Sequence, residues 1–532
     1  MTTTQPSLAS LWGTDVVRDP EGPCLLYAPR PASITGMLAG TRRWSERTFL
    51  VQGERRIDFG TFLDAVPRVA AEFAARGARV GDHVFLLAYN SPEFVLSIWA
   101  AWWAGLVPVL GNRWWSDREI EHAVELTKPV LALSDRARPV GATGTDWLAI
   151  QDQQEAFDAD SAGIDVREPQ DEVSPGLVLF TSGSSGAPKA VVLSRRSVVA
   201  NQHNLLSRSR QLPQDVPDDA PQQVMLACTP LFHVGGVSNL ITQLILGGRL
   251  VMTTGKFDAG EVLELIEREG VHRWGGVPTM AARVLAHPDF DRRDLSSLRS
   301  FPLGGAPVSA GLLDRMRAKL PQLQRRGLAN TWGMTESGGF VTVAGNRDLE
   351  RFPGTVGRPY PVAELRILDP DDTGRGEILL RSPTVMNGYL GLDDGTVDAD
   401  GWLHTGDLGR LNDDGYLFLD GRSKDIVIRG GENIACAHVE HALLAHPDIV
   451  EAAAFGVPHE DLGEELAAAV THRPGTAPTA EELRSFLRGR LAHFEVPTRW
   501  RIGDQPLPTL AGEKVDKKTL RNELERDGAS CD

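Results

Sequence analysis

The chain has 532 residues and a mass of 57.8 kDa, more than one hydrophobic core usually supports, so at least two domains are expected. Acidic residues outnumber basic ones, 71 to 55, for a formal charge of −16, so the broad positive surface of a nucleic-acid-binding protein is missing. The cysteines are far apart without a CxxC pair, which argues against a disulfide scaffold or a cysteine-rich zinc site and favours a reducing cytoplasm: Cys24, Cys228, Cys436 and Cys531.

The first hundred residues begin without the basic start and apolar stretch of a secretory signal. The apolar run at 83–89 is typical of a buried strand. Residues 94–111 approach the length of a membrane span, but Gly105 and Pro108 interrupt them, so a buried helix followed by a buried strand is expected and no integral membrane segment. Three tryptophans in this stretch leave peripheral contact with a membrane open: Trp99, Trp102 and Trp103.

The stretch LVLFTSGSSGAPKAVVLS, residues 177–194, leads from a buried strand into a loop of small and hydroxyl-bearing residues. Small residues let backbone N–H groups approach phosphate oxygens, hydroxyls add donors and the lysine supplies charge. The loop does not fit the Walker A pattern. A flexible surface loop is the alternative reading, and a strand before and a capped helix after favour the phosphate site. The candidate phosphate contacts are Thr181, Ser182, Gly183, Ser184, Ser185, Gly186 and Lys189.

Short apolar runs continue to alternate with helical patterns such as AGEVLELIEREG at 259–270, which predicts α/β layers with substantial sheet. The last hundred residues are expected to form a compact unit with strands at 450–457 and 465–472. A helix over 479–491 opens with a capping box, Thr479 to Glu482.

The loop at 181–189, TSGSSGAPK, resembles the signature of the acyl-adenylate-forming superfamily, which includes acyl-CoA synthetases, adenylation domains of peptide synthetases and firefly-type luciferases. The resemblance covers roughly residues 45 to 520 and is greatest to the acyl-CoA synthetases. Four further stretches resemble the other motifs of the family in the same order: NTWGMTESGG at 330–339, GRGEILLRS at 374–382, GWLHTGDLG at 401–409 and GRSKDIVIRGGENI at 421–434.

The resemblance implies an α/β fold with a large, multi-lobed N-terminal domain of two α/β subdomains and a β-barrel-like lobe. A small, mobile α+β domain should cap it. We place the boundary near Asp420 to Asp425, where a turn joins two strand-like runs, so the domains are residues 1–421 and 422–532 with a hinge near Lys424.

The resemblance also assigns four catalytic residues. Glu336 should bind Mg²⁺, Thr335 should hydrogen-bond the α-phosphate, and Lys189 belongs to the phosphate loop. Lys514 resembles the lysine that steadies the charge developing as a carboxylate attacks the α-phosphate. The family usually has glycine directly before that lysine, whereas Glu513 stands here.

For the nucleotide, Asp407 resembles the aspartate that accepts both ribose hydroxyls, with Arg422 beside it. Trp332 stands where the family usually has tyrosine, so adenine stacking is kept and a phenolic hydroxyl is lost. The other nucleotide-binding candidates are Gly305, Ala306, Pro307, Asn330, Thr331 and Gly333.

The acyl pocket is expected around His233, for which gating of carboxylate entry and a purely structural role are both open. Small side chains there should leave room for the acid, and the missing aspartate of peptide-synthetase domains disfavours an amino acid. Gly430 and Gly431 resemble the segment that lines the pantetheine tunnel. The acyl-pocket candidates are His233, Val234, Gly236, Gly304, Gly305 and Gly338.

The expected function is that of a carboxylic acid:CoA ligase that uses ATP, Mg²⁺ and coenzyme A and acts on a hydrophobic acid: fatty, aryl or polycyclic. An acyl-AMP ligase that loads a carrier protein is the nearest alternative, and a luciferase-like oxygenase a remote one. A catalytically silent nucleotide-binding scaffold is the alternative of another class. The sequence leaves the oligomeric state open, a homodimer included.

Overall fold

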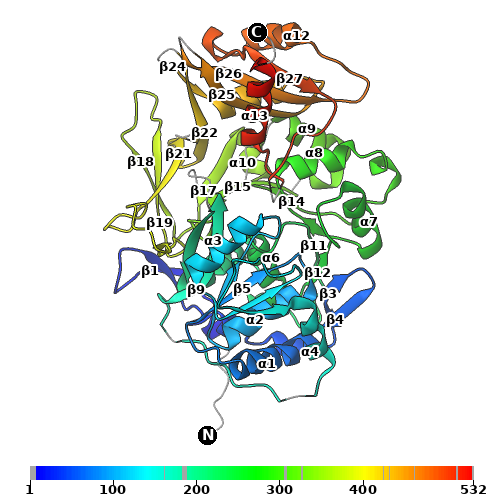
Figure 1. The fold of residues 1–532 in the computed structure, drawn as a ribbon, viewed down its shortest axis with the longest axis vertical. Helices are drawn as coiled ribbons and strands as arrows, with labels where there is room; N and C mark the ends of the chain where they lie inside the picture. The colour runs from blue at the N-terminus through cyan, green and yellow to red at the C-terminus, as the bar shows by residue number, and fades with distance from the viewer. Residues whose placement is uncertain are drawn as a thin grey trace.

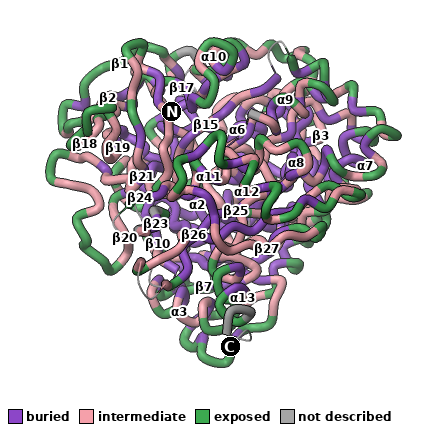
Figure 2. Tube along the Cα trace, turned by 90° about the horizontal axis from the view of Figure 1, so that it is seen from above, coloured by how far each residue is buried: buried purple, intermediate pink, exposed green. Residues whose placement is uncertain are grey.

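The computed structural model describes residues 8–160, 162–169, 171–182, 188–304, 308, 310–324, 327–422, 425–429, 432–459, 462–510 and 513–529. Figure 1 shows three large sheets with their helices in the body of the molecule and a smaller C-terminal unit at one end. Buried residues fill the interior of these layers, and exposed residues lie mainly at the rim (Figure 2). A two-stranded ribbon precedes the sheets: β1 (Asp15–Arg18) and β2 (Leu25–Ala28).

The first large sheet has seven strands in the order β20-β10-β9-β6-β5-β7-β8, of which β10 and β20 are antiparallel additions to a parallel core. Its strands are β5 (His83–Leu87), β6 (Val107–Leu110), β7 (Leu131–Ser134), β8 (Asp146–Ala149), β9 (Pro175–Ser182), β10 (Pro188–Ser194) and β20 (Gly388–Tyr389). The accompanying helices are α1 (Phe59–Ala75), α2 (Pro92–Trp103), α3 (Asp117–Thr127), α4 (Glu155–Asp158) and α5 (Arg195–Ser209).

The buried helix and strand expected over 94–111 are α2 and β6. The tryptophans that kept membrane contact open are core residues: Trp99 and Trp102 are fully buried, and the indole N–H of Trp103 donates to the carbonyl of Ile164 at 2.7 Å. They are thus not available to a membrane surface while α2 is folded. Within the described residues, no helix is both long enough and apolar enough to cross a membrane.

The phosphate loop joins β9 to β10, two antiparallel neighbours. The capped helix expected after it is α5, whose N-cap Ser194 accepts from the backbone N–H of Ser197, but α5 begins only after the whole of β10. The loop therefore lies in a β-hairpin and not directly at a helix N-terminus. The apolar run at 190–193 explains this, because it is buried on both faces as a strand.

The second sheet has the order β13-β11-β12-β3-β4. Its strands are β3 (Thr48–Gln52), β4 (Arg55–Asp58), β11 (Val224–Ala227), β12 (Arg249–Met252) and β13 (Arg273–Trp274). The helices in this part of the chain are α6 (Val234–Ile245), α7 (Ala259–Glu269), α8 (Pro278–Ala286) and α9 (Ala310–Lys319). Helix α7 confirms the prediction for 259–270: Asp258 caps its start and Gly270 ends it in the left-handed region.

The third sheet has eight strands in the order β14-β15-β16-β17-β22-β21-β19-β18 and stands where the barrel-like lobe was expected. All neighbouring pairs except β14 and β15 are antiparallel. The elements are β14 (Phe301–Leu303), β15 (Leu328–Met334), β16 (Gly339–Gly345), β17 (Thr355–Pro359), β18 (Glu364–Leu368), β19 (Gly376–Arg381), β21 (Leu403–Leu411), β22 (Leu417–Arg422) and α10 (Asn346–Arg351).

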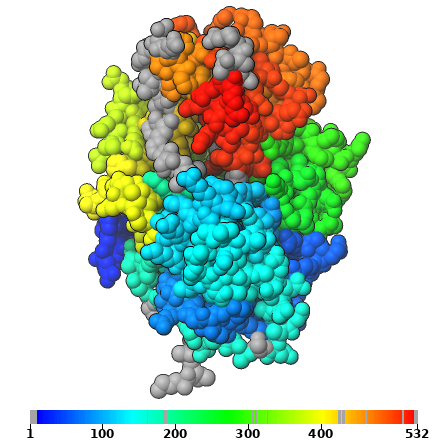
Figure 3. Space-filling model, in the orientation of Figure 1, coloured from blue at the N-terminus to red at the C-terminus, as the bar shows by residue number. Residues whose placement is uncertain are grey.

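The C-terminal unit has its own five-stranded sheet and apolar core, and Figure 3 shows it capping one end of the molecule. Both predicted strands and the helix with its capping box are confirmed as β25, β26 and α12. The elements are β23 (Ile426–Arg429), β24 (Glu432–Ala435), β25 (Ile449–His459), β26 (Gly463–His472), β27 (Arg499–Gly503), α11 (Cys436–Leu444), α12 (Ala480–Arg488) and α13 (Lys517–Ala529).

A buried ion pair ties the start of α5 to the N-terminal segment. Arg195 and Glu168 approach to 3.0 Å, with side chains 2% and 1% exposed. Glu168 also accepts hydrogen bonds from the backbone N–H groups of Ile34 and Thr35, at 2.8 and 2.7 Å. Glu168 thus joins Arg195 to the backbone of Ile34 and Thr35. Because α5 follows directly after β10, this contact also anchors the end of the hairpin that carries the phosphate loop.

We expect Glu168→Ala to lower the free energy of unfolding by about 3–5 kcal/mol, because it leaves the Arg195 guanidinium buried without its carboxylate. Asp64→Ala is the matched control: it breaks the exposed Arg42–Asp64 pair, which has the similar distance of 2.8 Å, and should cost about 0–1 kcal/mol. Urea unfolding followed by tryptophan fluorescence measures both, since only Trp500 lies in the C-terminal unit. Similar losses in the two variants would contradict this assignment.

Candidate functional site

Asp407 is buried on β21 and has both carboxylate oxygens engaged. The indole N–H of Trp332 donates to Oδ2 at 2.7 Å, and Nε of Arg422 donates to Oδ1 at 2.8 Å. Asp407 and Arg422 are direct partners across β21 and β22, and Trp332 comes from β15. The indole thus supplies a donor at the position where the family's tyrosine would offer a hydroxyl, and the carboxylate is held in one orientation.

Glu336 lies in the turn between β15 and β16, which the bond from the Gly338 N–H to the Thr335 carbonyl closes at 3.0 Å. The hydroxyl of Tyr389 donates to Oε1 of Glu336 at 2.9 Å. Burial, together with the nearby Glu336 charge, raises the pKa of Tyr389, so the phenol stays a neutral donor. Sequence reasoning missed Tyr389, because it lies 53 residues from Glu336 on the edge strand β20.

The Glu336 carboxylate fits the role of a magnesium ligand. Mg²⁺ in nucleotide enzymes is usually held by one or two protein carboxylates together with phosphate oxygens and water. The tyrosine bond occupies one lone pair of Oε1, and a carboxylate has about four acceptor sites. Among the described residues no group of three His, Cys, Asp or Glu side chains forms a metal cage, as expected where the cation arrives with the triphosphate.

Lys189 is the first charged residue after the phosphate loop and pairs across the hairpin with Thr181. Its Nζ lies 3.1 Å from Oδ2 of Asp394 and 4.5 Å from the ring centroid of Tyr389. Lys189 therefore lies over the ring of the same tyrosine whose hydroxyl binds Glu336. Asp394 is a second residue that the sequence motifs did not indicate.

Lys514 reaches this group from the C-terminal unit. Its segment is a turn closed by the bond from the Leu510 N–H to the Lys514 carbonyl at 2.7 Å. The side chain keeps contact with solvent, but the protein that surrounds it reduces its hydration and lowers the pKa of the ammonium. Arg422 lowers the pKa further, while Glu336 and Asp407 oppose the shift. The predicted lysine thus lies within electrostatic range of three other predicted site residues: Glu336, Asp407 and Arg422.

Other predicted nucleotide contacts are engaged within the protein. The amide of Asn330 donates to the Thr355 carbonyl at 3.1 Å, and the hydroxyl of Thr331 donates to the Leu303 carbonyl at 3.0 Å. Both side chains help to hold the third sheet together, and both residues are paired within the sheet through β15.

The glycines predicted to leave room for the acid are required for packing. A Cβ on Gly236, Gly304 or Gly338 would lie only 2.0–2.3 Å from an atom of Pro230, Thr331 or Thr384. The same holds for Gly333 against the Gly339 carbonyl. Close packing therefore requires glycine at these positions, and the part of Gly236, Gly304 and Gly338 in the acyl pocket stays a prediction. Gly235, which was not predicted, does face space: a Cβ there would meet only Phe340, at 3.8 Å.

His233 is the residue before α6, half-buried, with its ring 4.7 Å from that of Phe232. A small internal space, with room for about one water molecule, lies beside α6 between α5, β9 and β10. Its polar end carries two buried amide atoms without a hydrogen-bond partner among the described residues, Oδ1 of Asn201 and Nε2 of Gln202. Its lining includes the predicted Val234 and Gly338, and the whole set is Leu177, Leu193, Val198, Asn201, Gln202, Val234, Val237, Ser238, Ile241 and Gly338.

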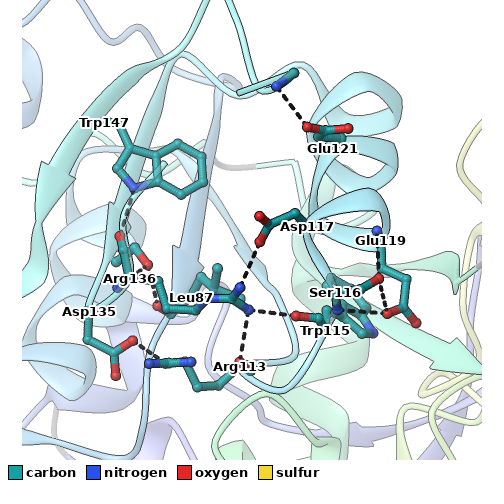
Figure 4. Close-up of polar contacts among 12 residues, drawn as sticks. Leu87, Arg113, Trp115, Ser116, Asp117, Glu119, Glu121, Asp135, Arg136 and Trp147 are labelled. Atoms are coloured by element: carbon teal, nitrogen blue, oxygen red, sulfur yellow. Dashed lines mark hydrogen bonds and ion pairs between the residues drawn. The ribbon is translucent and has the colours of Figure 1, made fainter. Parts of the chain in front are cut away.

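A second small space, partly open and with room for about one or two water molecules, lies where the ends of β5 and β11 face the C-terminal unit, with Trp114 and Glu513 in its wall. Polar contacts fix the loop that carries Trp114 (Figure 4). Arg136 donates to the Trp115 carbonyl and to Asp117, and Arg113 pairs with Asp135. This wall is therefore rigid on the side of the N-terminal body.

Several predicted residues lie outside the described residues, and their places in the site stay predictions: Gly183, Ser184, Ser185, Gly186, Gly305, Ala306, Pro307, Lys424, Gly430 and Gly431.

Two family models match the chain: that of the AMP-binding enzymes over residues 39–390, and that of the AMP-binding enzyme C-terminal domain over residues 438–512. The first covers more than half of the chain, and the second falls within the C-terminal unit.

Named relatives and solved structures agree with these matches. A feruloyl-CoA synthase of Amycolatopsis is 33% identical over 89% of this chain and 95% of its own. An indoleacetate–CoA ligase of Aromatoleum aromaticum is 32% identical over 89% and 94%. The o-succinylbenzoate CoA synthetase of Bacillus subtilis, solved with its acyl-adenylate intermediate, superposes with a TM-score of 0.77 at 26% identity, covering 92% of this chain and 97% of that one. The chain therefore belongs to the AMP-binding enzyme family, among the AMP-forming acyl-CoA ligases.

Proposed function

We propose that this ligase activates a hydrophobic carboxylic acid and transfers its acyl group to coenzyme A, with Mg-ATP as the other substrate. In the first step a carboxylate oxygen attacks the α-phosphorus and pyrophosphate leaves. In the second, the thiolate attacks the acyl carbon and AMP leaves. One observation carries the proposal: Lys514 of the C-terminal unit lies within electrostatic range of Glu336 and Asp407 of the N-terminal body and of Arg422 at the domain junction.

Each of these side chains has a part that its surroundings support. Asp407, held by Trp332 and Arg422, keeps one free lone pair on each oxygen and so can accept both ribose hydroxyls. Glu336 would hold Mg²⁺, which neutralises phosphate charge when bound. Lys514 would stabilise the negative charge that grows on the α-phosphate during attack.

Six aliphatic side chains surround the small space beside α6, so its surroundings suit a hydrophobic group. Gly235, also on α6, has open space where a side chain would stand, bounded only by Phe340. The relatives named for ferulate and indoleacetate handle acids with a ring system. Fatty, aryl and polycyclic acids therefore all stay within the proposal, and delivery to a carrier protein is the competing acceptor.

The proposed moving part is the C-terminal domain, residues 422–532, turning on a body of residues 1–421 about the hinge at Lys424. Arg422 ends β22 and Ile426 starts β23, so the boundary falls where the chain leaves one sheet and enters another. A cytoplasmic location and a homodimeric state belong to the same set of proposals.

The activity test is pyrophosphate release with Mg-ATP across a panel of fatty, aryl and polycyclic acids, with and without coenzyme A. We expect release that rises strongly with coenzyme A for one class of acid. Each acid is paired with its hydroxylated analogue, because a hydroxyl can both donate to Asn201 and accept from Gln202. Acid-dependent release indifferent to coenzyme A would favour a carrier protein, and no release with any acid would favour the silent scaffold.

Trp332→Phe should raise the KM for ATP about tenfold or more, since hydrogen bonds to charged groups contribute about 1.5–3 kcal/mol and the phenyl ring removes the donor to Asp407. Trp332→Tyr is the matched control, with a hydroxyl that can restore a donor. An unchanged KM in Trp332→Phe would show that Arg422 alone holds the carboxylate.

The pH profile of adenylation should report Lys514. Its lowered pKa means that the ammonium loses its charge at a lower pH than an ordinary lysine, so kcat/KM should fall as pH rises through that value. Lys514→Arg keeps its charge at all accessible pH values and should be slower but without this alkaline limb. The same limb in both enzymes would assign it to another group.

A further inference from the structure

Glu513 is the residue at which this chain departs from the glycine that its family usually places before the adenylating lysine. It has φ of +62°, in the left-handed region where glycine is unstrained and a glutamate is not. A side chain tolerated at such a position is usually held by its surroundings.

The surroundings of Glu513 belong to the N-terminal body. Its carboxylate pairs with Nη1 of Arg283 on α8, and its carbonyl accepts from the hydroxyl of Thr279 on the same helix at 2.5 Å. Within its own turn, its carboxylate also accepts from Thr509 at 3.3 Å. Side chain and backbone are thus both fastened to α8, one residue before Lys514.

Arg283 makes further contacts with the C-terminal unit. Its Nε lies 3.2 Å from Glu451 on β25, and its Nη2 donates to the carbonyl of Leu507 at 3.3 Å. Glu451 is almost fully buried and also accepts from the backbone N–H of Leu507 at 2.7 Å. One arginine of the body therefore holds three points of the C-terminal unit, and Figure 1 shows α8 beside the strands of that unit.

We propose that Arg283 and Glu513 form a latch that holds the C-terminal unit in the adenylating orientation and positions Lys514. The inference rests on the proposed rotation of that unit. The latch contacts are formed in the arrangement in which Lys514 lies within electrostatic range of Glu336 and Asp407, and a rotation that carries Lys514 away separates Glu513 from α8. The pair acts through Lys514 and touches no substrate, so it is a positioning pair. It biases the enzyme toward the first half-reaction.

The test separates the half-reactions. Adenylation is followed as pyrophosphate release in a single turnover without coenzyme A, and transfer as acyl-CoA formation from supplied acyl-AMP. We expect Glu513→Gln to slow adenylation about tenfold and to leave transfer within twofold of the wild type. Glu513→Gly, which relieves the backbone but also lacks the carboxylate, should behave in the same way.

Glu523→Gln is the matched control. It breaks a carboxylate–arginine pair of 3.1 Å with Arg501 that lies wholly within the C-terminal unit, and it should leave both steps within twofold. Arg283→Gln should slow adenylation at least as much as Glu513→Gln, and the double variant should be no slower than Arg283→Gln alone, because the two residues act as one contact.

Equal loss in both half-reactions, or wild-type adenylation in Glu513→Gln, would overturn the latch. A second readout needs no substrate. Single-molecule energy transfer between dyes on α7 and α12 reports the distance between the body and the C-terminal unit. The distribution of transfer efficiencies should broaden in Glu513→Gln and stay narrow in Glu523→Gln. Unchanged transfer in both would also overturn it. If the wild-type enzyme releases no pyrophosphate with any acid, the proposed function fails instead, and the dye measurement still judges the latch.

Discussion

A protein of net charge −16 that handles a triphosphate has to gather positive charge locally and keep it in place. In this fold two cations of the site stand against carboxylates: Lys189 against Asp394, and Arg422 against Asp407. Such pairing fixes the cations before a ligand arrives, so little reorganisation is left for the moment of binding. The pairing also means that phosphate oxygens compete with the Asp394 carboxylate for the ammonium of Lys189. A protein with a large net negative charge can therefore still bind a triphosphate at a site where cations are held in place.

The pairing depends on the third sheet and its neighbours. Trp332, Asp407 and Arg422 come from three strands of that sheet, and Tyr389 brings in the edge of the first one. Rigid strands hold these atoms, whereas Lys514 comes from a turn of a separate unit with its own core. The division suits a reaction in which the nucleotide stays in place while one cation is needed for one step only. A lysine with a lowered pKa is also the kind of group whose effect depends strongly on what surrounds it.

Much of this could be predicted from the sequence, because motifs and strands are local. The motifs TWGMTES and LHTGDLG pointed to Glu336 and Asp407, two apolar runs located β25 and β26, and a capping box located the start of α12. Contacts distant in the chain gave no such signal: Tyr389 reaches Glu336 across 53 residues, and Arg283 reaches Glu513 across 230. Glycine was ambiguous for another reason. Its lack of a side chain can serve close packing as well as ligand space. Only the structure shows that Gly338 is tightly packed and that Gly235 has open space beside it.

Glu513 shows how a departure from a family pattern acquires meaning only in three dimensions. Read as sequence, an acid next to the adenylating lysine would weaken the field of that lysine. In the fold, the carboxylate pairs with Arg283, so its charge is largely compensated before it reaches Lys514. A glycine would give the same backbone conformation without strain, but it could not join α8 through an ion pair. The ion pair with Arg283 therefore offsets the backbone strain at Glu513. In the proposed latch, this contact between the domains exists only in the orientation that it stabilises.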